Sequence, residues 1–204
     1  MICINNLFRN NICCNFTNYL KEIFSSMLDK IRRFVQSFVL KVKLKQHHRE
    51  KKISSLNSAK TVGIVCLVDK EINWNTIKTV IKEFQEKKAK VEIMGVFYGN
   101  LKPLWFIETL NVTLCSDKEL GLMQVPTGIH ITEFLAKEFD LLINFSLADD
   151  FAPFYIAALS KAKFKIAIDT EDNRKHFDML LKLEQANMID YRNQLVHYLS
   201  QINI

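Results

Sequence analysis

Residues 139–168, FDLLINFSLADDFAPFYIAALSKAKFKIAI, decide the fold class of this chain. This stretch opens with a nearly uninterrupted apolar run, Leu141–Phe145, and closes with a second one, Phe164–Ile168. A strand that helices cover on both faces loses the alternating pattern of a half-exposed strand and is apolar throughout. Between the two runs, Asp149 and Asp150 are typical N-cap residues of a short helix. Strand, helix and strand in so few residues predict a right-handed parallel crossover.

The same unit recurs earlier in the chain. Residues 61–69 and 91–98 are apolar runs typical of buried strands, and residues 74–88 between them have helical periodicity. The remaining predicted elements are a strand over 112–115, a helix within 127–139, an edge strand within 177–183 and a closing helix over 187–202. We therefore expect residues 61–204 to form a single three-layer, Rossmann- or flavodoxin-like α/β domain with a mostly parallel sheet.

Charge is distributed unevenly along the 204 residues. Residues 1–52 contain eleven Lys and Arg against three Asp and Glu, whereas residues 53–204 contain 17 and 19. The formal net charge of +6 therefore comes from the N-terminal arm, because the rest of the chain is close to neutral. Such an asymmetry indicates an acidic partner, such as nucleic acid, anionic lipid or an acidic protein face.

The arm has a helical pattern from Met27 onward. We expect a poorly ordered extension over 1–26, a basic amphipathic helix over 27–53 and a polar linker over 54–60; one hypothesis is that translation starts at Met27. The apolar stripe of the helix includes Ile31, Phe34, Val35 and Phe38. The basic residues predicted to bind an anionic surface are Lys30, Arg32, Arg33, Lys41, Lys43, Lys45, Arg49, Lys51 and Lys52.

Three interpretations of this helix compete. It can lie in the interface of an anionic membrane, it can dock on ribosomal RNA or an acidic protein, or its stripe can pack on its own domain. The first two predict a non-enzymatic binding or adaptor protein in which the α/β domain is the interaction body. The sequence leaves the choice between lipid, RNA and protein open.

Glycine and cysteine usage argue against several common sites. The loop after the first predicted strand, residues 69–73, lacks the glycine fingerprint of dinucleotide-binding domains, and the chain has only five glycines. Cys66 and Cys115 fall in predicted buried strands, and no Cys or His spacing is typical of a metal site. We therefore expect no metal or cofactor, and a cytoplasmic location with the arm at the inner face of the membrane as one possibility.

A second function class depends on the carboxyl ends of the predicted strands, where open α/β sheets bind ligands. Asp69 follows the first strand, and Ser146, Asp149 and Asp150 follow the strand at 141–145. These four residues are the candidate ligand site of a small enzyme or nucleotide-binding domain. For the loop at 146–150, the competing interpretation is that it forms an ordinary helix cap.

The stretch at 139–168, preceded by the basic helix and followed by the closing VHYLSQIN helix, resembles a family of uncharacterised proteins of Bacteroidota-type bacteria. The resemblance covers Met27 to Ile204 and implies a fold without implying site residues. More distantly, the strand, loop and ALSKAKFKI segment is similar to the acceptor half of heptosyltransferase-like GT-B enzymes. Those enzymes hold their sugar donor on a second Rossmann-type domain, which 204 residues do not accommodate.

Overall fold

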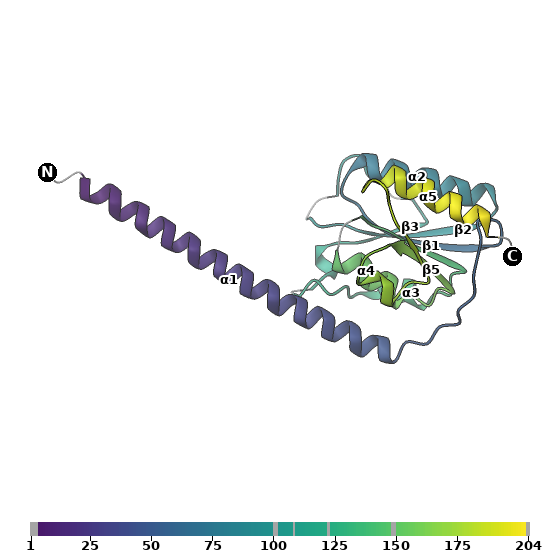
Figure 1. The fold of residues 1–204 in the computed structure, drawn as a ribbon, viewed down its shortest axis with the longest axis horizontal. Helices are drawn as coiled ribbons and strands as arrows, with labels where there is room; N and C mark the ends of the chain where they lie inside the picture. Colours follow the sequence, from purple (N-terminus) through teal and green to yellow (C-terminus); the bar gives the residue numbers. More distant parts are fainter. Residues whose placement is uncertain (1–3, 100–101, 108, 122, 148–149, 203–204) are drawn as a thin grey trace. The chain divides into compact units, whose positions relative to one another are not determined.

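The computed structural model describes residues 4–99, 102–107, 109–121, 123–147 and 150–202, with side chains from Phe24 onward (Figure 1). The chain divides into two units, Met1–Lys41 and Val42–Ile204. We call the second unit the body.

The body is built on one six-stranded sheet in the order β3-β2-β1-β4-β5-β6, and every neighbouring pair is parallel. The strands are β1 (Thr61–Leu67), β2 (Lys90–Val96), β3 (Val112–Cys115), β4 (Leu141–Phe145), β5 (Phe164–Ile168) and β6 (Met179–Leu181). The predicted α/β class with a parallel sheet is thus confirmed, and it is one Rossmann-like domain. The strand order is the classical dinucleotide-fold order, with its reversal between β1 and β4.

Helices cover both faces of the sheet. Figure 1 shows α2 (Glu71–Glu86) and α5 (Met188–Gln201) on one side, and α3 (Ile129–Ala136) and α4 (Phe151–Leu159) on the other. Two short 3-10 helices, Asp117–Glu119 and Asn173–Lys175, complete the regular structure of the described residues. All five residues of β4 are buried, which explains why its sequence does not alternate.

Helix α1, Ile4–Lys45, is longer at its start and shorter at its end than expected. It includes residues 4–26, which we expected to be poorly ordered. The first glycine of the chain is Gly63 and the first proline is Pro103, so no helix breaker interrupts this region. Its end at Lys45 corrects the expected limit at residue 53, and no sequence signal such as glycine marks that end.

Residues 46–60, which we call the strap, pack against the rest of the body instead of forming more helix and a loose linker. The backbone N–H of Lys52 donates to the carbonyl oxygen of Lys163 at 3.2 Å, and that of Leu56 donates to Leu199 at 3.2 Å. Ser55 and Leu56 are buried. Tertiary contacts therefore fix the conformation of the strap. Its polar sequence does not predict these contacts.

The closing helix α5 is locked to the sheet by Tyr191. Its ring stacks on Phe145 with the centroids 4.4 Å apart, and its hydroxyl donates to the carbonyl oxygen of Asn144 at 2.8 Å. The side chain is fully buried, and burial raises the pKa of its phenol far above the usual range.

We predict that Tyr191→Phe lowers the free energy of unfolding by about 1 kcal/mol, because it removes one buried hydrogen bond and keeps the ring. Tyr191→Ala should cost about 3–5 kcal/mol, because it also removes the stacked ring. Urea denaturation of the two variants measures both values. Equal losses would contradict the separate role given to the hydroxyl.

Candidate functional site

The strand-end candidates lie where the strand order of the sheet reverses. Asp69 follows β1 and Ser146 follows β4, and these two strands are neighbours in the sheet. The structure therefore brings the ends of two predicted segments together at the place where open α/β sheets bind ligands. Asp149 lies outside the described residues, and Asp150 occupies the N-cap position of α4.

The carboxylate of Asp69 has a structural task at this edge. Its Oδ1 atom accepts hydrogen bonds from the backbone N–H of Lys70 at 2.7 Å and from the Nδ2 atom of Asn73 at 2.9 Å. These bonds fasten the turn that leads into α2, but they are not a helix cap, because the N-cap residue of α2 is Lys70 and no side chain caps this helix. Ser146 is buried.

Asp150 lies close to Tyr98 at the same edge. Burial, followed by the nearby Asp150 charge, raises the pKa of Tyr98 to about 12. Although Asp150 is in the N-cap position, its side chain makes no capping hydrogen bond to α4. Within the described residues, no group of three or more His, Cys, Asp or Glu side chains is arranged to hold a metal ion.

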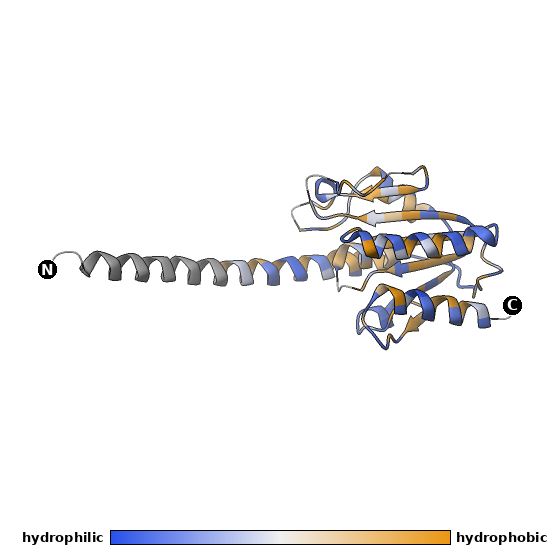
Figure 2. Cartoon of the chain, turned by 90° about the horizontal axis from the view of Figure 1, so that it is seen from above, coloured by the Kyte–Doolittle hydropathy of each residue, from blue (hydrophilic) through white to orange (hydrophobic). Residues whose placement is uncertain are grey.

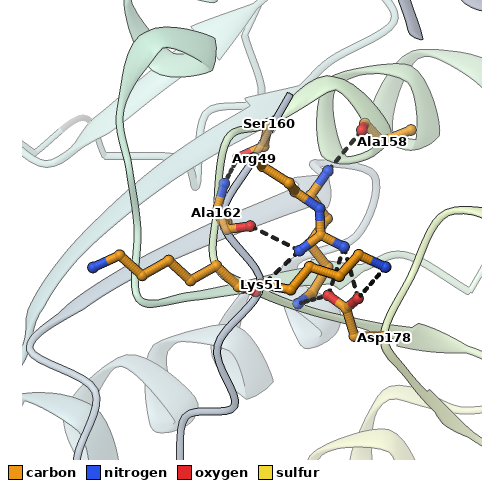
Figure 3. Close-up of polar contacts among 8 residues, drawn as sticks. Arg49, Lys51, Ala158, Ser160, Ala162 and Asp178 are labelled. Atoms are coloured by element: carbon orange, nitrogen blue, oxygen red, sulfur yellow. Dashed lines mark hydrogen bonds and ion pairs between the residues drawn. The ribbon is translucent and has the colours of Figure 1, made fainter. Parts of the chain in front are cut away.

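The best-defined polar cluster of the body is elsewhere, around Arg49 of the strap (Figure 3). The guanidinium group binds both carboxylate oxygens of Asp178 at 2.7 and 2.8 Å. It also donates to the carbonyl oxygens of Ala162 at 3.1 Å and Lys163 at 3.0 Å. The exposed fraction of the Arg49 side chain is only 9%, compared with 72% for Lys51, the second cation paired with Asp178. We call this arrangement the Arg49 clamp.

Asp178 is saturated by its partners in the clamp. Besides Arg49 and Lys51, it accepts the backbone N–H of Lys165 at 2.9 Å. Burial opposes ionisation of Asp178, but the hydrogen bonds from Arg49 and from the Lys165 backbone outweigh it, so the pKa of the carboxyl group is lowered. A bidentate arginine–carboxylate pair with further donors is the arrangement in which a largely buried ion pair is satisfied.

Lys165 on β5 is the unusual member of the cluster, because its residue is 1% exposed. Its Nζ atom donates to the carbonyl oxygen of Ala158 at 2.6 Å, near the carboxyl end of α4. Burial, and then the positive charge of Arg49, lower the pKa of its amine to about 7. Burial followed by the Lys165 charge also lowers the pKa of His47 and His176. The cluster is therefore crowded with cationic groups.

Some of the predicted surface cations have partners within the chain. Arg49 belongs to the clamp, Arg32 pairs with Asp29 at 3.1 Å, and the Nζ atom of Lys43 lies 5.5 Å above the Tyr155 ring. The predicted cations that remain exposed are Lys30, Arg33, Lys41, Lys43, Lys45, Lys51 and Lys52. Sequence reasoning missed Asp178 and Lys165, although a lysine inside the apolar run of β5 was a visible signal.

The clamp predicts a large difference between two neighbouring cations that share Asp178. Arg49→Met should lower the free energy of unfolding by about 3–5 kcal/mol, because it leaves a largely buried carboxylate without its main partner. Lys51→Met, the matched control, should cost less than about 1 kcal/mol, because that amine is exposed. Chemical denaturation tests both, and similar losses would show that the clamp is no stronger than a surface pair.

Lys165 predicts a characteristic pH dependence. Because its folded pKa of about 7 lies below its ordinary value of 10.5, the unfolded chain binds the extra proton between these pH values. Its contribution to stability therefore rises as the pH rises through this window, by up to about 1.4 kcal/mol per pH unit. Lys165→Met should be more stable than the wild type at pH 6, and this advantage should shrink toward pH 9. If the stability difference between Lys165→Met and the wild type does not change with pH, the lowered pKa of Lys165 is contradicted.

Comparison with known proteins identifies the family of the chain but not its function. No curated protein matches the chain. The bacterial origin and the similarity to heptosyltransferase-like enzymes stay predictions. A family model matches residues 32–202, which include the last turns of α1 and nearly the whole body. The chain therefore belongs to DUF6913, a family of unknown function.

Proposed function

We propose that the protein is a non-enzymatic adaptor whose helix α1 attaches the α/β body to an anionic membrane face. The observation that carries this proposal is a row of exposed large apolar side chains on α1: Phe24, Met27, Ile31, Phe34 and Phe38. Phe34 and Phe38 are 73% and 60% exposed. With 100° between successive helix residues, these five side chains fall within an arc of about 80°.

Cations border this stripe on α1. Seen down the helix axis, Lys30 and Lys41 lie next to one border of the stripe, and both are exposed. Arg33 lies farther around the helix. Val35, the fourth predicted apolar anchor, is only half-exposed and extends the apolar face on its other side. Figure 2 shows hydrophobic and hydrophilic residues alternating along the coloured part of α1.

An apolar face bordered by lysine and arginine is the pattern of a helix that lies in the membrane interface. The apolar side chains enter the acyl boundary, and the cations stay at the lipid headgroups. None of the helices in the described part of the chain combines the length and the apolarity needed to cross a bilayer. Attachment to a surface is therefore the role that these residues suit. Phenylalanine on this face favours lipid over RNA, because lipid binding gains from burying apolar area.

The proposal predicts that the double variant Phe34→Ser and Phe38→Ser no longer floats with vesicles of phosphatidylcholine and phosphatidylserine. Each lost phenylalanine should lower the partition coefficient by about tenfold, because burying this side chain contributes roughly 1.5 kcal/mol or more. Flotation of the full chain through a density gradient measures the loss.

A matched control is available on the body, where Leu104 and Ile107 are also exposed. The variant Leu104→Ser and Ile107→Ser removes a comparable apolar area outside α1 and should float like the wild type. Equal loss in both variants would contradict attachment through α1. Sedimentation of the wild type with ribosomes, without any flotation on vesicles, would assign the helix to RNA instead.

A further inference from the structure

We infer that the amino-terminal edge of the body's sheet is a second contact surface for the same anionic membrane, one that binds headgroups by charge alone. This inference rests on the proposed attachment through α1. The surface is a row of lysines at the starts of neighbouring strands and on the strap, which we call the lysine row: Lys52, Lys60, Lys90, Lys161 and Lys163.

Hydrogen bonds place these lysines side by side although they are far apart in the sequence. The backbone N–H of Lys52 donates to the carbonyl oxygen of Lys163. The Nζ atom of Lys163 lies 3.1 Å from Oδ1 of Asp140, and Oδ2 of Asp140 accepts the backbone N–H of Lys60 at 3.0 Å. Lys90 continues the row, because its N–H donates to the carbonyl oxygen of Lys60 at 2.7 Å.

The spacing of the row follows from the sheet. Neighbouring strands lie about 4.8 Å apart, so each step along the row moves the next ammonium group by a distance of this order or a small multiple of it. Only a parallel sheet collects the starts of its strands at one edge in this way. A row of charges with such spacing suits the headgroup layer of a membrane, where each ammonium group can pair with a different headgroup.

Acidic side chains neutralise the row only in part. Asp140 is paired with Lys163, and Glu92 is paired with Lys90 and Lys137. Glu50 and Glu138 line the same edge, in a hollow of about 220 Å³ that Lys161 and Lys163 share. The opposite, carboxyl-terminal edge is mixed in charge: it carries Asp69, Glu71, Asp117, Asp150 and Asp169 together with Lys70, Lys118, Lys182 and Arg174, and Arg174 is paired with Asp169.

The lysine row is exposed positive charge on a body whose residues 53–204 are almost neutral in total. A negatively charged membrane attracts the lysine row. The strap, which follows α1 in the sequence, contributes Lys52 to this row, so the two proposed contact surfaces are consecutive in the chain.

The residues of the row favour lipid over RNA. Lysine presents a compact, strongly hydrated point charge, whereas arginine and aromatic side chains supply the planar contacts of single-strand RNA binders. The exposed apolar residue beside Lys52 is Ile53, which is 58% exposed. An aliphatic side chain enters a lipid interface but cannot stack on a base.

The test compares two triple variants of the full chain on vesicles with and without phosphatidylserine. Lys52→Gln, Lys60→Gln and Lys161→Gln remove three exposed charges from the row. Each lysine near the surface contributes about 1 kcal/mol, or about fivefold, before screening by salt. We expect at least a tenfold weaker partition into phosphatidylserine-containing vesicles and no change on phosphatidylcholine alone.

The matched control removes the same number of charges from the other edge of the sheet, through Lys70→Gln, Lys118→Gln and Lys182→Gln. It should change the partition by less than twofold. Equal loss in the two triples would show a general net-charge effect and overturn the inference, as would wild-type binding by the row variant.

The two proposals fail in distinguishable ways. If the row variant binds like the wild type while the Phe34→Ser and Phe38→Ser variant is lost, the inference fails and attachment through α1 stands. If the α1 variant binds like the wild type, attachment through α1 fails. If the row variant loses ribosome sedimentation but keeps vesicle binding, the row belongs to RNA and the inference is overturned.

Discussion

One guanidinium group holds three distant pieces of the body together. Arg49 of the strap reaches the carbonyl oxygens of Ala162 and Lys163, in the turn between α4 and β5, and it grips Asp178 just before β6. An arginine suits this position because its planar donors can satisfy a carboxylate and two carbonyls at the same time. Without that cation, the carbonyl oxygen of Ala162 and the largely buried carboxylate of Asp178 would lose their main donor, and the carbonyl oxygen of Lys163 would keep only the Lys52 N–H.

The clamp also explains why a lysine is tolerated inside the sheet. The amine of Lys165 donates a hydrogen bond to the carbonyl oxygen of Ala158 at the end of α4. The last carbonyl groups of a helix have no partner within the helix. Burial, and then the positive charge of Arg49, lower the pKa of the Lys165 amine to about 7. Lys165 thus supplies a donor at the carboxyl end of α4, and Arg49 supplies donors to the turn that follows this helix.

The parallel sheet has a further electrostatic consequence. Because all six strands run the same way, the residues at their starts, among them Lys60, Lys90 and Lys163, collect at one edge of the sheet. The proposed attachment to an anionic surface uses these lysines together with the exposed phenylalanines of α1.

The sequence by itself determined the elements whose signal is local. The apolar runs of β1, β2, β4 and β5 predicted buried strands, and the spacing of Ile31, Phe34 and Phe38 predicted an amphipathic helix. Only the folded structure decided the strand order and the end of α1 at Lys45. It also decided that Arg49 pairs with a carboxylate of the body. Arg49 and its carboxylate partner are 129 residues apart, so no window of sequence contains both. A basic run has the same composition whether solvent, a membrane or a distant aspartate receives its charges, and only the packing of the strap on the body selects among them.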